Sequence, residues 1–147
     1  MTAMERSGAI RERPRMGVIR AYGWLTGLIA ALIVLQAFLA GEWLAGNNAI
    51  KVHGAIGLAL VALSLAQLAL AIAARAAGPD RRTLLSLSSL LLALMIVQLV
   101  LGEAGADHAD QARPFHLSIG VLLFGIAGSS AVVAQRLRRH PSESGDR

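Results

Sequence analysis

The 147-residue sequence contains no cysteine, which excludes structural disulfides, thiolate metal sites and the covalent attachment of a c-type haem. Charged residues are also scarce, and no Asp, Glu, Lys or Arg occurs within residues 21–41, 52–74, 83–102 or 114–135. Each stretch is long enough for a helix to cross a bilayer, which takes roughly 20 apolar residues. The sequence therefore predicts a membrane protein with four spans. A soluble enzyme, a disulfide-stabilised domain and a nucleic-acid-binding protein are excluded as leading hypotheses, because too little chain remains outside the spans.

Positive charge is distributed unevenly around the four stretches. Twelve of the 14 Lys and Arg residues precede the first stretch, separate the second from the third, or follow the fourth. Only Lys51 and Arg113 lie on the opposite side, where Glu42 and Glu103 add negative charge. The positive-inside rule then predicts a multi-pass protein of the cell membrane with both termini in the cytoplasm. This distribution accounts for the net charge of +5 without nucleic acid, so the lipid bilayer is the expected partner.

Short connections join the charge-free stretches, so consecutive helices are expected to be antiparallel neighbours. The predicted fold class is all-α, an integral membrane four-helix bundle with up-down-up-down topology. The spans are expected over residues 18–41, 50–75, 83–103 and 114–136. Together they form one transmembrane domain over residues 17–138, between flexible cytoplasmic tails at 1–16 and 139–147. Tyr22 and Trp24, near the cytoplasmic end of the first span, are typical of the aromatic belt at a membrane interface.

The two halves of the sequence share a pattern of polar residues, which indicates an internal repeat. In each half a Gln is followed by Gly-Glu, an acidic connection, a cation and then His-x-x-Ile-Gly. The first copy consists of Gln36, Gly41, Glu42, Lys51, His53, Ile56 and Gly57. The second copy consists of Gln98, Gly102, Glu103, Arg113, His116, Ile119 and Gly120. Two antiparallel helices per copy give both copies the same orientation, so the repeats are predicted to be parallel.

His53 and His116 are the only histidines within the four stretches, which also lack charged residues. Ionisable groups at membrane depth are costly and tend to face the interior of a bundle, so both are functional candidates. Both begin helices that run from the outer to the inner side, and they are expected at similar depth on diagonal helices. A diagonal of the order of 14 Å between such helices suits a flat macrocycle held edge-on between two imidazoles. We therefore expect both histidines to ligate the iron of a b-type haem.

Two further pairs favour the same cofactor. Gly57 and Gly120 follow the histidines by one helical turn, where the absence of a side chain would leave room for a porphyrin. Lys51 and Arg113 precede the histidines at the outer interface, where they are placed to pair with haem propionates. The alternative is that each histidine is a hydrogen-bonding anchor near a helix end and that the glycines are ordinary helix-packing contacts.

Three glutamines lie within the spans. Gln36 and Gln98 are expected at about the depth of the histidines, where they would hydrogen-bond the free ring nitrogen of each ligand. An interhelical hydrogen bond is the equally favoured alternative for both, and Gln67 is expected to link helices in this way. The outer connection with Glu103, Asp107, His108 and Asp110 matches no specific metal-ligand spacing, and an exposed acidic loop is the favoured interpretation.

The segment Gln98-x-x-Leu101-Gly102, followed by an outer loop and by His116 at the start of the next helix, resembles the haem A synthase family. Proteins of that family are typically eight-helix membrane enzymes built from two four-helix bundles, each with a histidine pair from its second and fourth helices. The resemblance covers about residues 20–136 and implies that His53 and His116 are the axial ligands of a b-type haem. This chain supplies one bundle, and its first outer loop lacks the cysteine pair found in many members.

Three functions are consistent with these features. The first is a bis-histidine, cytochrome-like protein for electron transfer or haem handling at the outer face, with a respiratory-chain protein as its partner. The second is a half-size, haem A synthase-like oxygenase that acts as a homodimer. The third is an accessory membrane subunit or small transporter without a cofactor. The sequence is thus compatible both with an enzyme and with a protein that catalyses no reaction.

Overall fold

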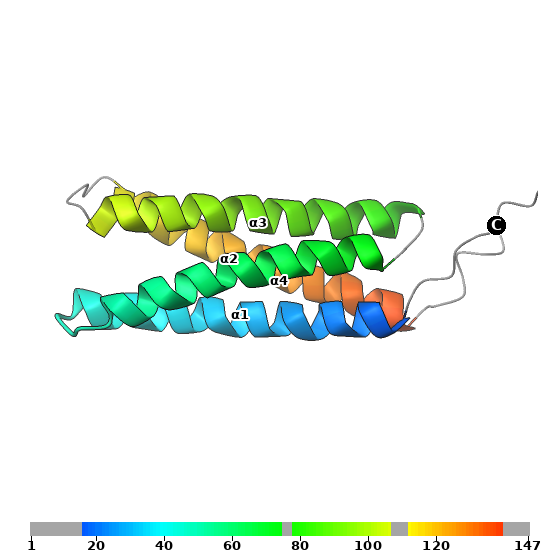
Figure 1. The fold of residues 1–147 in the computed structure, drawn as a ribbon, viewed down its shortest axis with the longest axis horizontal. Coiled ribbons are helices and arrows are strands. Elements are labelled where there is room, and N and C mark those ends of the chain that lie inside the picture. Colours follow the sequence, from blue (N-terminus) through cyan, green and yellow to red (C-terminus); the bar gives the residue numbers. More distant parts are fainter. Residues whose placement is uncertain (1–15, 75–77, 107–111, 140–147) are drawn as a thin grey trace, which may run out of the picture.

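The computed structural model describes residues 16–74, 78–106 and 112–139, which form four long helices (Figure 1). The helices are α1 (Met16–Leu44), α2 (Ile50–Ala73), α3 (Gly78–Ala106) and α4 (Ala112–Arg139). Each helix packs against its neighbours in the sequence, and α4 also packs against α1, so the four helices surround a common axis. The predicted all-α, up-down-up-down bundle is therefore confirmed, with α2 and α4 as diagonal partners.

All four helices are long and apolar enough to cross a membrane. Their apolar side chains cover the outward as well as the inward surfaces, and Trp24 and Val121 are 78% and 76% exposed. A helix that is apolar on every side is typical of a membrane span, because its outer face contacts lipid. The chain is thus an integral, multi-pass membrane protein that contacts the lipid bilayer.

The helices extend beyond the charge-free stretches. Met16, which the sequence analysis assigned to the first tail, is the first residue of α1, and α3 begins at Gly78, five residues before the predicted third span. Apolar composition marks the part of a helix that lies in lipid, whereas the helical hydrogen bonds continue until the chain turns. Arg139, assigned to the second tail, is the last residue of α4, and the other residues of the two predicted tails lie outside the described residues.

The two ends of the bundle carry different side chains. We call the end with His53 and His116 the histidine end; there α1 and α3 finish and α2 and α4 begin. The opposite end, which we call the arginine end, carries six exposed arginines: Arg20, Arg81, Arg82, Arg136, Arg138 and Arg139. Asp80, in the first turn of α3, adds one negative charge beside them.

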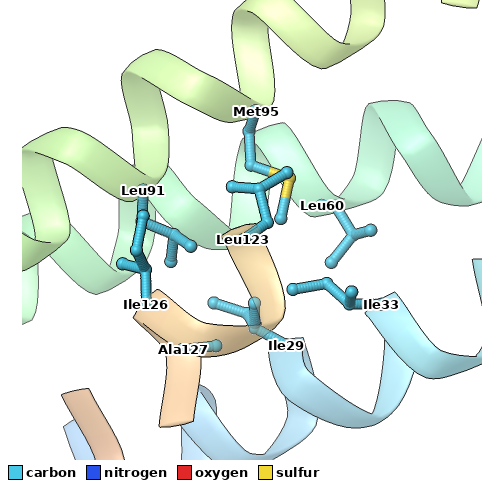
Figure 2. Close-up of a cluster of buried hydrophobic side chains, with 8 residues drawn as sticks. All are labelled: Ile29, Ile33, Leu60, Leu91, Met95, Leu123, Ile126 and Ala127. Atoms are coloured by element: carbon cyan, nitrogen blue, oxygen red, sulfur yellow. The ribbon is translucent and has the colours of Figure 1, made fainter. Parts of the chain in front are cut away.

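The larger core cluster lies on the bundle axis, where side chains from all four helices meet (Figure 2). It consists of Ile29, Ile33, Leu60, Leu91, Met95, Leu123, Ile126 and Ala127. Lipid tails are as apolar as leucine, so burial of these side chains gains little from the hydrophobic effect. Close van der Waals packing between the helices is therefore the main stabilising contribution of this cluster.

A second core cluster lies toward the arginine end. Its buried members are Ile19, Tyr22, Ala71, Ala74, Leu84 and Ala134. Tyr22 is only 1% exposed, so its predicted position in the interfacial aromatic belt is wrong. The reason is helical periodicity, because Tyr22 shares one face of α1 with the buried residues Ile19, Thr26 and Ile29.

Most of the buried positions follow the internal repeat. On α1 and α3 they correspond at an offset of 62 residues: Tyr22 with Leu84, Thr26 with Ser88, Ile29 with Leu91, and Ile33 with Met95. On α2 and α4 they correspond at an offset of 63 residues: Leu60 with Leu123, Ser64 with Ala127, Gln67 with Ser130, and Ala71 with Ala134. Both halves thus present equivalent helix faces to the core, as expected for parallel two-helix repeats.

Candidate functional site

His53 and His116 approach one another across the axis of the bundle. His53 is the fourth residue of α2 and His116 is the fifth residue of α4, so they come from diagonal helices. Their ring centroids are 5.9 Å apart and the ring planes are tilted by 53°. Both side chains are half-buried. The structure thus brings together the two residues that the sequence pattern singled out as ligands.

His116 is held by two contacts with Gln98 on the neighbouring helix α3. The ring Nδ1 lies 3.1 Å from the backbone carbonyl oxygen of Gln98. The side-chain Nε2 of Gln98 in turn donates to the backbone carbonyl oxygen of His116 at 2.7 Å. A carbonyl oxygen can only accept, so Nδ1 must carry the proton in this contact and Nε2 is left with the lone pair.

His53 has one of these two contacts. Gln36 Nε2 donates to the backbone carbonyl oxygen of His53 at 3.0 Å, which repeats the contact between Gln98 and His116. The ring Nδ1 of His53 is buried and has no hydrogen-bond partner. The two histidines are therefore equivalent in their backbone contacts but differ in how their rings are held.

Both glutamines bond a backbone carbonyl oxygen of the histidine, whereas the sequence analysis expected the ring nitrogen. The interhelical hydrogen bond that was the stated alternative is therefore present at Gln36 and at Gln98. Gly57 and Gly120 explain this geometry. A Cβ at Gly57 would lie 3.3 Å from Gln36 Nε2, and a Cβ at Gly120 would lie 3.5 Å from Gln98 Nε2. The space that these glycines leave is occupied by the glutamine amides, so both glycines are helix-packing contacts in this structure, the stated alternative to room for a porphyrin.

The charged residues expected beside the histidines lie near the ends of the helices. Lys51 is exposed in the first turn of α2, and Arg113 lies in the first turn of α4, with its side chain outside the described part of the structure. Glu42 accepts a hydrogen bond from Asn47 Nδ2 at 2.6 Å. At the connection between α3 and α4, Glu103 is exposed near the end of α3, whereas Asp107, His108 and Asp110 lie outside the described residues.

A bare metal ion would have too few ligands at this site. Within residues 16–74, 78–106 and 112–139, no group of three or more His, Asp or Glu side chains is placed to hold a metal ion. Protein-bound transition metals usually take at least three protein ligands, and four in structural sites. A metal held by His53 and His116 alone must therefore bring most of its own ligands.

Gly102 is a residue of the site whose role the sequence analysis missed. A Cβ at this position would lie 3.3 Å from His116 Cε1 and 3.7 Å from Nδ1, so the ring lies directly over the glycine. The motif paired Gly102 with Gly41. Gly102 follows Gln98 by four residues, however, and the residue that follows Gln36 by four is Ala40, which is therefore its counterpart. The offset of 62 residues between the two glutamines was the signal that could have shown this.

Comparison with known proteins gives no relative of this chain: no protein-family model, no curated protein and no solved structure matches it. The fold is thus a four-helix bundle of membrane-length apolar helices, without an assigned family. Its function has to be argued from the site at the histidine end.

Proposed function

We propose that the protein binds one b-type haem between His53 and His116 and serves in electron transfer or haem handling at the outer face of the cell membrane. The observation that carries this proposal is the approach of the two imidazoles to 5.9 Å from diagonal helices. Histidines that served only as separate anchors at the membrane interface would have no reason to converge on the bundle axis.

The distance between the rings supports a shared metal ion. A metal–nitrogen bond of about 2 Å, with about 1.2 Å from the nitrogen to the ring centre, puts the centroids of two opposed imidazoles about 6.4 Å apart. The observed separation of 5.9 Å is about 0.5 Å shorter, so a small outward shift of the rings would admit the metal ion. The tilt of 53° is also compatible with a linear arrangement, because each ring can rotate about its own bond to the metal.

The small number of protein ligands favours haem over a bare ion. Two axial imidazoles complete the coordination of an iron whose other four ligands come from the macrocycle. The described part of the chain supplies no third His, Asp or Glu beside this pair. A haem needs no third protein ligand, so the two imidazoles are a suitable set of ligands for this group.

The contacts of His116 and His53 also fit an axial role. The Gln98 carbonyl oxygen holds the Nδ1 proton of His116, which leaves Nε2 free to bind iron. The buried Nδ1 of His53 has no protein partner. This nitrogen is therefore available, and coordination through it would satisfy a buried atom that otherwise has no partner.

Charge and packing support a site at the outer face of the membrane. Under the positive-inside rule, the six exposed arginines at the opposite end favour a cytoplasmic position for that end. The histidine end then lies at the outer face, where Lys51 is available to pair with a propionate. Ile56 and Ile119 follow the histidines by three residues on α2 and α4 and pack against the larger core cluster, so the next layer of the bundle is apolar.

Absorption spectra of the full-length protein in detergent test this proposal. We expect protein expressed with a haem supply to show a Soret band and, after reduction with dithionite, the sharp α and β bands of a bis-histidine haem. His53→Ala and His116→Ala should each change the Soret band or remove it. His140→Ala is the matched control, because it removes a histidine that follows the end of α4 and should leave the spectrum unchanged.

Colourless wild-type protein, or spectra that both substitutions leave unaltered, would reject the proposal. Mass analysis of the extracted pigment addresses the oxygenase hypothesis in the same preparation. Unmodified haem b is expected, whereas hydroxylated haem would identify a haem A synthase-like enzyme.

A further inference from the structure

A second group of polar side chains lies far from the histidines, inside the half of the bundle nearer the arginine end. Gln67 on α2 donates through Nε2 to the Tyr22 hydroxyl of α1 at 3.1 Å. The Tyr22 hydroxyl lies 3.0 Å from Ser88 Oγ of α3. Gln67 follows His53 by 14 residues on the same helix, which corresponds to about 21 Å along the axis. This polar layer, defined by Tyr22, Gln67 and Ser88, is therefore a separate feature and does not depend on haem.

The amide of Gln67 is not satisfied within the protein. Gln67 is fully buried, and its Oε1 has no hydrogen-bond partner. Exchanging the amide oxygen and nitrogen does not solve the problem. Tyr22 could then donate to Oε1, but the NH2 group would lose the Tyr22 hydroxyl as its acceptor. In the orientation that the structure shows, the oxygen side of the amide lacks a partner.

Neither the membrane nor the other repeat supplies the missing partner. Lipid tails offer no hydrogen-bonding groups, and an unsatisfied amide in an apolar environment is costly. The residue that corresponds to Gln67 in the second repeat is Ser130, and its hydroxyl donates to the carbonyl oxygen of Ile126 at 2.9 Å. A second glutamine there could have paired with Gln67, but the serine is already bonded to its own helix.

The surroundings of Gln67 are rich in hydroxyl groups with spare acceptor capacity. Thr26 and Ser64 are fully buried one helical turn from Tyr22 and Gln67, respectively. Each donates its only hydroxyl proton to a carbonyl oxygen of its own helix, at 2.9 Å for Thr26 and 2.8 Å for Ser64. A hydroxyl that donates in this way still has lone pairs to accept a hydrogen bond.

We propose that the polar layer binds an ordered water molecule that hydrogen-bonds the free side of the Gln67 amide. Water is the smallest molecule that both donates and accepts, so it satisfies Gln67 in either amide orientation. It can donate to Oε1 and give its second proton to a hydroxyl oxygen of the layer. Buried waters typically make two to four hydrogen bonds to groups that are otherwise unsatisfied, and the layer offers that number of partners.

Nuclear magnetic resonance of the full-length, isotope-labelled protein in lipid nanodiscs tests the proposal. A cross-peak is expected between the side-chain NH2 of Gln67 and water, with the sign of direct contact. A water-soluble paramagnetic chelate should not broaden the Gln67 signal, since the site is closed to bulk solvent. Gln67→Met identifies the signal by removing it. The absence of a water cross-peak in the wild-type protein would overturn the proposal.

Exchange through a neighbouring hydroxyl could imitate such a cross-peak, so the sign of the cross-peak in the rotating frame provides the control. A bound water gives the sign of direct dipolar contact, whereas the sign of chemical exchange would show that a hydroxyl proton was the source and would also overturn the proposal. Infrared spectra after exchange into H2 18O give an independent measurement. We expect a narrow, isotope-sensitive O–H band that is present in the wild type and absent in Gln67→Met. A wild-type spectrum without this band would count against the water.

Discussion

The imidazole of His116 lies over the backbone of Gly102, where a Cβ would come within 3.3 Å of the ring carbon Cε1. This position allows the ring Nδ1 to reach the carbonyl oxygen of Gln98, one turn earlier on α3. The corresponding position in the first repeat is Ala40, and there the ring Nδ1 of His53 has no partner. The two copies of the repeat thus differ by one methyl group at the position that contacts the ring of His116.

Gly102→Ala is expected to displace the ring of His116 and to break its hydrogen bond with the Gln98 carbonyl oxygen. Loss of a hydrogen bond that orients a metal ligand typically weakens metal binding by about 10-fold or more. Haem titration of the purified apoprotein measures this change, and imidazole 15N shifts report the state of Nδ1 directly.

Gly41→Ala is the matched control for that substitution, because a Cβ at Gly41 would meet nothing within 4 Å. It adds the same methyl group near the same end of the bundle and should leave haem affinity and the His116 signals unchanged. Equal effects of the two substitutions would contradict the role assigned to Gly102.

The spans and the bundle were predictable from the sequence because an apolar stretch of about 20 residues without charge is typical of a membrane-spanning helix. The histidine pair was predictable because polar residues inside apolar spans are few and were matched between the repeats. The contacts of Gln36 and Gln98 were not predictable in the same way. Their amide groups can reach a ring nitrogen or a backbone carbonyl oxygen, and the packing against Gly57 and Gly120 decides between them.

The position of Tyr22 was mispredicted for a related reason. These helices are apolar on every side, so the pattern of apolar residues does not show which face is buried. The interfacial preference of tyrosine then pointed to the membrane surface, whereas Gln67 and Ser88 on neighbouring and diagonal helices provide partners inside the bundle. The interhelical role predicted for Gln67 was confirmed because a buried amide in an apolar span has few other ways to be satisfied.

The contact between Tyr22 and Ser88 should contribute measurably to stability. Double-mutant cycles on buried hydrogen bonds in a membrane protein give about 0.6 kcal/mol on average and at most about 1.7 kcal/mol. We expect the cycle formed by Tyr22→Phe, Ser88→Ala and the double variant to give a coupling free energy in this range. Unfolding in mixed detergent micelles measures it, and strictly additive single effects would show that the two hydroxyls do not interact.

Packing on the bundle axis should be far more sensitive to truncation than packing against lipid. Leu60 and Leu58 lie two residues apart on α2, and their side chains are 3% and 63% exposed. Leu60→Ala leaves a cavity in the larger core cluster and is expected to lower the free energy of unfolding by about 2 kcal/mol or more. Leu58→Ala removes the same atoms from the lipid-facing surface and should change the free energy of unfolding by less than about 0.5 kcal/mol. Similar losses from both variants would contradict the buried position of Leu60.

The absence of cysteine makes the orientation in the membrane directly testable, because the wild-type protein is its own unlabelled background. Asn48→Cys introduces a thiol at the exposed connection between α1 and α2, at the histidine end. Ser142→Cys introduces one three residues after the end of α4, beyond the arginine end. Since the arginines are expected to retain their end in the cytoplasm, a membrane-impermeant maleimide should label the first variant in intact cells and the second only after lysis. The reverse pattern would place the histidine pair at the cytoplasmic face, and the proposed function at the outer face would then be wrong.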